Sequence, residues 1–214
     1  MRNILKIPVA TLAVALSFVT GSYAADDATT ADSPVQSSVR DLSAYYEKPG
    51  VDLSQYNAIL LDNLNVDDAR VLPPPWYADA NRNPQKWQLT DSDLIWLRKS
   101  YREAMQAKIS PNGGYPVVAQ PGAGVLIVDV SIVYLMPYAR KGEEVTTLGF
   151  GEMLVQAQLR DGMTQELLAV YEGKQEVGSG YQQNTRLNNQ HSLRELFDVW
   201  GARLRGILDS KKLE

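Results

Sequence analysis

The chain has 214 residues, with 21 basic against 25 acidic side chains and a formal net charge of −4. It contains no cysteine and one histidine, which excludes disulfides, thiol nucleophiles and metal centres that need several Cys or His ligands from one chain. The acidic balance and the lack of a long Lys/Arg run also argue against nucleic acid as a partner. The composition is otherwise that of a globular protein.

The N-terminus has the pattern of a secretory signal peptide. A basic start and an apolar stretch over residues 7–19 are followed by Ser22 and Ala24, small residues at the cleavage positions. The apolar stretch is shorter than the roughly 20 residues that span a bilayer, and no later stretch reaches that length. The pattern predicts a signal peptide over residues 1–24, a periplasmic or secreted product and no transmembrane segment after cleavage. An uncleaved N-terminal helix is the alternative.

The chain that follows is expected to form one domain. Residues 25–44 begin with Ala, Asp, Thr, Ser and Pro, a composition that buries too little apolar surface to order itself. We expect a flexible lead-in there and a single α+β domain over residues 45–214, a length that supports one core without disulfides.

The first half of the domain is expected to contain a strand, a long loop and a helix. Residues 56–66 form a short apolar run typical of a strand, and residues 67–89 show neither helical nor alternating periodicity. Thr90 and Asp93 have capping-box spacing, and apolar residues then recur at helical spacing over residues 91–109.

The second half is expected to contain four strands and a helix. A short strand over 115–119 precedes a strand over 125–135, in which Leu126 to Tyr134 alternate as one apolar face. Residues 153–160 and 166–175 are predicted to form a hairpin, the second strand having an uncertain register. Ser192 and Glu195 have capping-box spacing and are predicted to begin an amphipathic C-terminal helix.

This order predicts an α+β fold. We expect a two-layer sandwich with a mixed, mostly antiparallel sheet of about five strands and two helices packed on one face. If the first two strands are parallel, the helix between them makes a right-handed crossover.

Several stretches resemble a known family. They are Val51-Asp-Leu-Ser-Gln-Tyr56, Pro121-Gly-Ala-Gly-Val-Leu126, Gln158 to Leu167 and Phe197 to Leu204. In this order they are similar to the bacterial envelope family catalogued as domain of unknown function 3313, over residues 45–209. The resemblance implies a small exported α/β domain, often a lipoprotein, with no assigned activity. This chain departs from that pattern because it lacks the cysteine to which a lipid is attached.

The sequence offers no strong catalytic, cofactor-binding or metal-binding residues. His191 lies next to the predicted helix start, where a local role is typical. Glycine pairs at 149 and 151 and at 178 and 180 are too sparse for a phosphate-binding fingerprint and indicate strand or loop punctuation. We therefore expect a non-enzymatic binding or assembly module without a cofactor. A periplasmic hydrolase acting on envelope glycan or peptide is the alternative.

The loop over residues 67–89 is the best candidate for a partner-binding surface. It contains Trp76, Tyr77 and Trp87, residue types that are enriched at interface hot spots. The alternative is that these aromatic side chains lie back on the domain as a lid over its core. We expect a mixed outcome, with Trp87 structural and Trp76 exposed. The partner would be another envelope protein or a second copy of the chain.

Overall fold

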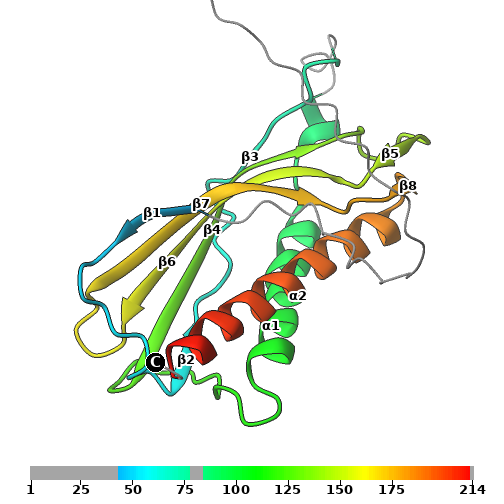
Figure 1. The fold of residues 1–214 in the computed structure, drawn as a ribbon. Coiled ribbons are helices and arrows are strands. Elements are labelled where there is room, and N and C mark those ends of the chain that lie inside the picture. Colours follow the sequence, from blue (N-terminus) through cyan, green and yellow to red (C-terminus); the bar gives the residue numbers. More distant parts are fainter. Residues whose placement is uncertain (1–42, 78–83, 213–214) are drawn as a thin grey trace, which may run out of the picture. The chain divides into compact units, whose positions relative to one another are not determined.

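The computed structural model describes residues 43–77 and 84–212. The predicted signal peptide and the predicted lead-in as far as residue 42 lie outside these residues. The described chain forms a six-stranded sheet in the order β1-β7-β6-β4-β2 with β3 also paired to β4, and a separate two-stranded ribbon of β5 and β8. Figure 1 shows α1 and α2 side by side on one face of the large sheet. The strands are β1 (Ser43–Glu47), β2 (Ala58–Leu61), β3 (Arg70–Val71), β4 (Val125–Pro137), β5 (Thr146–Leu148), β6 (Gly151–Asp161), β7 (Leu167–Val177) and β8 (Tyr181–Gln183), and the helices are η2 (Pro84–Trp87), α1 (Asp91–Ile109) and α2 (Arg186–Lys211).

The predicted α+β class is confirmed, and the sheet is larger than expected. β1 pairs antiparallel with β7 at one edge and was not predicted as a strand. At the other edge β2 and β3 both run parallel to β4, whereas β4, β6 and β7 are antiparallel to one another. The sheet is larger than expected because β1 and β3 were not predicted: β1 lies at the boundary of the expected lead-in, and β3 has only two residues within the expected loop.

One predicted strand is shorter than expected, and another, over residues 115–119, does not form. The run over 56–66 is a strand only over Ala58–Leu61, after which a single bridge joins Asn65 to Ser131 of β4. Residues 115–119 contribute one bridge, between Val117 and Ile59. Both segments still run along the parallel edge of the sheet, because backbone amides in them donate to carbonyls of β2 and β4. These hydrogen bonds are too widely spaced to form continuous strands.

A bulge in β4 changes which side chains face the helices. The alternation from Leu126 to Ile132 is confirmed, with these even-numbered residues buried. The register against β6 then shifts between Ile132 and Tyr134, so Leu135 is buried in place of Tyr134. The prediction that Tyr134 lies on the inner face was wrong, because an extra residue in one strand reverses the faces that follow. The hydroxyl of Tyr134 instead donates to Glu152 Oε1 at 3.1 Å.

The core lies between the sheet and the two helices. The Tyr101 ring of α1 meets the Phe197 ring of α2 edge-on at 5.8 Å between centroids. Phe197 in turn lies 5.2 Å from Trp200. The predicted cap of α1 is confirmed: Thr90 and Asp93 exchange side-chain to backbone hydrogen bonds as a capping box. Within the described residues, no helix is long and apolar enough to cross a membrane.

The predicted start of the C-terminal helix was wrong. α2 begins at Arg186, and Thr185 is its cap, accepting from the Asn188 amide at 3.2 Å. Ser192 lies within the helix, is buried, and donates to Gln182 Oε1 at 2.7 Å. Serine in a helix interior is acceptable when its hydroxyl finds a partner, and β8 supplies that partner. His191 is therefore also helical and pairs with Glu195, one turn later, at 3.2 Å.

Candidate functional site

The predicted aromatic loop presents its three aromatic residues differently. It contains β3 and η2, and residues 78–83 lie outside the described part of the chain. Trp76 is 63% exposed, and its ring centroid lies 5.9 Å from that of Tyr138. Trp87 is 6% exposed, and its indole Nε1 has no hydrogen-bond acceptor among the described residues.

Tyr77 is half-buried and held from three sides. Its hydroxyl donates to Glu143 Oε2 at 2.6 Å, its ring meets Trp87 edge-on at 5.1 Å, and the guanidinium of Arg140 lies 4.8 Å from the ring centroid. Desolvation and then the hydrogen bond to Glu143 raise the pKa of Tyr77 to about 12. Glu143 and Arg140 lie in the loop after β4 and Trp87 lies in η2, so two segments of the domain hold the residue next to Trp76.

The two interpretations of the loop therefore apply to different residues. Trp87 and Tyr77 lie against the domain, as the lid interpretation expects. Trp76 is exposed beside an anchored neighbour, as a binding surface requires. The burial of Trp87 and the exposure of Trp76 agree with the mixed outcome expected from the sequence, and a partner for Trp76 stays a prediction.

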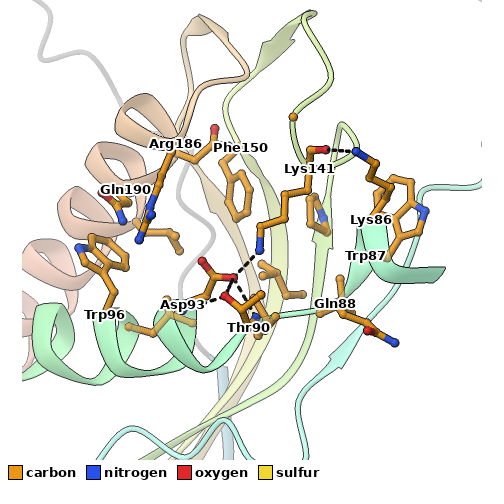
Figure 2. Close-up of a pocket in the computed structure, with 18 of the residues that line it drawn as sticks. Lys86, Trp87, Gln88, Thr90, Asp93, Trp96, Lys141, Phe150, Arg186 and Gln190 are labelled. Atoms are coloured by element: carbon orange, nitrogen blue, oxygen red, sulfur yellow. Dashed lines mark hydrogen bonds and ion pairs between the residues drawn. The ribbon is translucent and has the colours of Figure 1, made fainter. Parts of the chain in front are cut away.

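Trp87 also forms one wall of a cavity of about 550 Å³. The cavity lies where η2, the starts of α1 and α2, and the ends of the long strands meet, and Figure 2 shows the side chains around it. Its apolar walls include Trp87, Trp96, Leu97, Leu135, Phe150 and Leu193. We call this space the η2 cavity.

The polar rim of the η2 cavity carries more positive than negative charge. Lys86, Lys141 and Arg186 lie on it with one carboxylate, Asp93. Lys141 Nζ contacts Asp93 Oδ2 at 2.5 Å. Desolvation raises the pKa of Asp93, but hydrogen bonds from Lys141 and Thr90 outweigh it, so this pKa lies below its ordinary value. Asp93 is therefore ionised at neutral pH.

A directed chain of side-chain hydrogen bonds fixes the mouth of the cavity. Ser192 donates to Gln182 at 2.7 Å, Gln182 to Asn189 at 3.0 Å, and Asn189 to Asn184 at 2.9 Å. Asn184 then donates to the backbone carbonyl of Arg140 at 2.9 Å. This chain joins α2, β8 and the loop that carries Lys141, and it holds Asn184 and Asn189, two polar residues of the cavity lining, in place.

One protein family matches most of the chain. The family model described as "Protein of unknown function (DUF3313)" matches residues 33–204. The chain belongs to the DUF3313 family. The resemblance found in the sequence is thereby confirmed. No curated protein matches this DUF3313 chain.

This DUF3313 chain is similar at a low level to two solved structures. A Xanthomonas campestris protein of family model DUF330 is 12% identical with a TM-score of 0.44, covering 77% of this chain and 93% of its own. The PelC dodecamer from Paraburkholderia phytofirmans is 8% identical with a TM-score of 0.37, covering 73% of this chain and 92% of its own. Similarity at this level carries no inference about activity or assembly.

The η2 cavity of this DUF3313 chain was not predicted from the sequence. Its walls come from four segments far apart in the chain, so no local spacing reveals them. Two local features of the sequence point to this region. Trp96 is a large apolar residue outside the row of buried residues along α1, and Phe150 lies between two glycines. Within the described residues, no three His, Asp or Glu side chains gather as a metal site requires.

Proposed function

We propose that this DUF3313 protein is exported to the cell envelope and binds another envelope component, or a second copy of itself, through a surface centred on Trp76. One observation carries the proposal: Trp76 is 63% exposed although its neighbour Tyr77 is anchored to the domain. Tryptophan is among the residues most enriched at binding hot spots.

The anchoring of Tyr77 strengthens the proposal through preorganisation. A side chain that is already held in place loses less conformational entropy on binding than one on a mobile loop. The hydrogen bond from Tyr77 to Glu143 and the edge-on contact of its ring with Trp87 limit the motion of the adjacent residue. Trp76 and Tyr138 together then form a fixed aromatic platform.

The hydrolase alternative finds less support in the η2 cavity. A general acid needs a pKa near the working pH, whereas the ion pair with Lys141 and the capping bonds lower the pKa of Asp93. Asp93 is moreover occupied in capping α1. Its environment suits a structural carboxylate better than a catalytic one.

The export part of the proposal predicts a processed N-terminus. Because the basic start, the short apolar stretch and the small residues at 22 and 24 occur together, we expect signal cleavage after Ala24. N-terminal sequencing of protein purified from its native host should begin at Ala25, and the protein should fractionate with the periplasm. Retention of Met1 in the purified protein would contradict export by this route.

The binding part predicts a loss of partner capture without a loss of stability. Trp76→Ala should change the free energy of unfolding by no more than about 1 kcal/mol, because an exposed side chain leaves little cavity. Crosslinking and affinity capture from an envelope extract should lose the specific partner, since an aromatic anchor carries much of the interface energy.

A matched control for this variant is Tyr181→Ala on β8, where the aromatic side chain is 83% exposed. This variant should be as stable and should retain the partner. If Trp76→Ala captured the same specific partners as the unmodified protein, Trp76 would not be the binding anchor.

A further inference from the structure

We infer that the η2 cavity is a binding site for an anionic amphiphile, a molecule with an apolar chain and a single carboxylate or phosphate group. The chain would lie among Trp87, Trp96 and Phe150, with the acidic group at the rim that Lys86, Lys141 and Arg186 line. This site is separate from the proposed partner surface, because Trp76 does not line the cavity. The two proposals can fail independently.

The interior of the cavity suits an apolar chain. Leu97, Leu135 and Leu193 are buried at its base, and Trp96 and Phe150 are partly buried against the core. The volume of about 550 Å³ falls within the range of small-molecule sites, which are mostly apolar with a few polar groups that orient the ligand. Water in such a space gains few hydrogen bonds, so an apolar chain displaces it favourably.

The rim suits one anionic group. Three cations, Lys86, Lys141 and Arg186, face one carboxylate, that of Asp93, in a chain whose formal net charge is −4. Asp93 pairs with Lys141. Among the described residues, Lys86 donates to the Lys141 carbonyl at 3.4 Å and Arg186 to Ser92 Oγ at 3.4 Å, and neither forms an ion pair.

The cations lie on both sides of the cavity mouth, so an acidic group at the rim meets positive charge on either side. Figure 2 shows Lys141 reaching to Asp93 from the loop after β4, and Arg186 extending from the start of α2 on the other side of Phe150. Both α1 and α2 begin at this rim, so their positive ends reinforce the side-chain charges. Arginine offers paired N–H groups that match a carboxylate or phosphate.

Other ligand classes fit less well. A neutral apolar ligand would leave the cations without a partner, and inorganic phosphate would leave the apolar walls in contact with water. A cationic amphiphile would meet the surplus positive charge. The combination of apolar walls and two cations without ion pairs therefore selects an amphiphile with a negative head group.

The test measures binding of four probes to the purified protein by calorimetry, below their micelle concentrations. Dodecanoate and dodecyl phosphate should bind, and comparison of the two distinguishes a carboxylate from a phosphate head group. Acetate and dodecyltrimethylammonium should not bind. Intrinsic tryptophan fluorescence should be quenched by 12-bromododecanoate both in the unmodified protein and in Trp76→Ala, because Trp87 and Trp96 line the cavity and Trp76 does not.

The decisive variant is Lys86→Gln combined with Arg186→Gln. Both side chains are exposed, so the variant should fold, and its affinity for the anionic probe should fall at least about tenfold because charge-assisted hydrogen bonds are lost. The control is Lys99→Gln on α1, whose side chain is 72% exposed and lies outside the cavity lining. Failure of both anionic probes to bind, equal binding of the cationic probe, or an equal loss in Lys99→Gln would overturn the inference.

Discussion

Replacing Trp200 with alanine is expected to lower the free energy of unfolding by about 3 to 5 kcal/mol, the range for large aromatic truncations in a core. Trp200 is 7% exposed and lies 5.2 Å from the Phe197 ring between α2 and the sheet. Its indole Nε1 also donates to Gln175 Oε1 at 3.3 Å, and Gln175 is fully buried. The variant therefore loses apolar contacts and weakens the hydrogen bonding of a buried amide.

Urea unfolding of the purified variant measures this loss. The matched control is Ile207→Ala on the same helix, where the side chain is 40% exposed and about 1 kcal/mol or less is expected. Equal, small effects in the two variants would mean that α2 does not dock on the sheet through Trp200.

The second large effect is expected for Gly149→Ala, at about 2 to 5 kcal/mol. Gly149 has φ +70°, and a Cβ there would lie 2.6 Å from the Val177 carbonyl oxygen and still closer to that of Gly178. These are rigid backbone atoms at the point where β6 and β7 end and the β5–β8 ribbon begins. The alanine variant is therefore destabilised in two ways: its backbone must adopt a left-handed conformation, and its Cβ clashes with the two carbonyl oxygens.

A second glycine separates the two costs. Gly50 has φ +73°, but a Cβ there would have no atom within 4 Å. Gly50→Ala should therefore show the backbone cost alone, at most about 1 to 2 kcal/mol. Denaturant unfolding of both variants gives the comparison, and a loss in Gly149→Ala no greater than in Gly50→Ala would contradict the packing of these strand ends.

Local patterns predicted the elements whose partners lie nearby in the sequence. The Thr90 capping box is one of them, because both of its hydrogen bonds are made within one turn. The same pattern at Ser192 failed, since Ser192 bonds to Gln182 of β8 and the helix had already begun. Leu187 is 78% exposed and interrupts the apolar periodicity in the first turn of α2. The periodicity therefore did not indicate where this helix begins.

Long-range packing decided the features that the sequence did not reveal. The bulge that turns Leu135 inward arises from the pairing of β4 with β6, which no period in β4 encodes. The η2 cavity depends on four separate segments. The difference in burial between Trp76 and Trp87 could be expected, because Trp87 lies three residues before the cap of a helix, whereas Trp76 follows a run of prolines.

The most direct test of the binding proposal is photocrosslinking at position 76. Trp76 is replaced by benzoylphenylalanine in the full chain, with the same replacement at the exposed Tyr181 as control, and cells of the native host are irradiated. We expect a discrete covalent adduct from position 76, to an envelope protein or to a second copy of the chain, and none from position 181. No adduct from position 76, or the same adduct from both positions, would contradict a partner surface centred on Trp76.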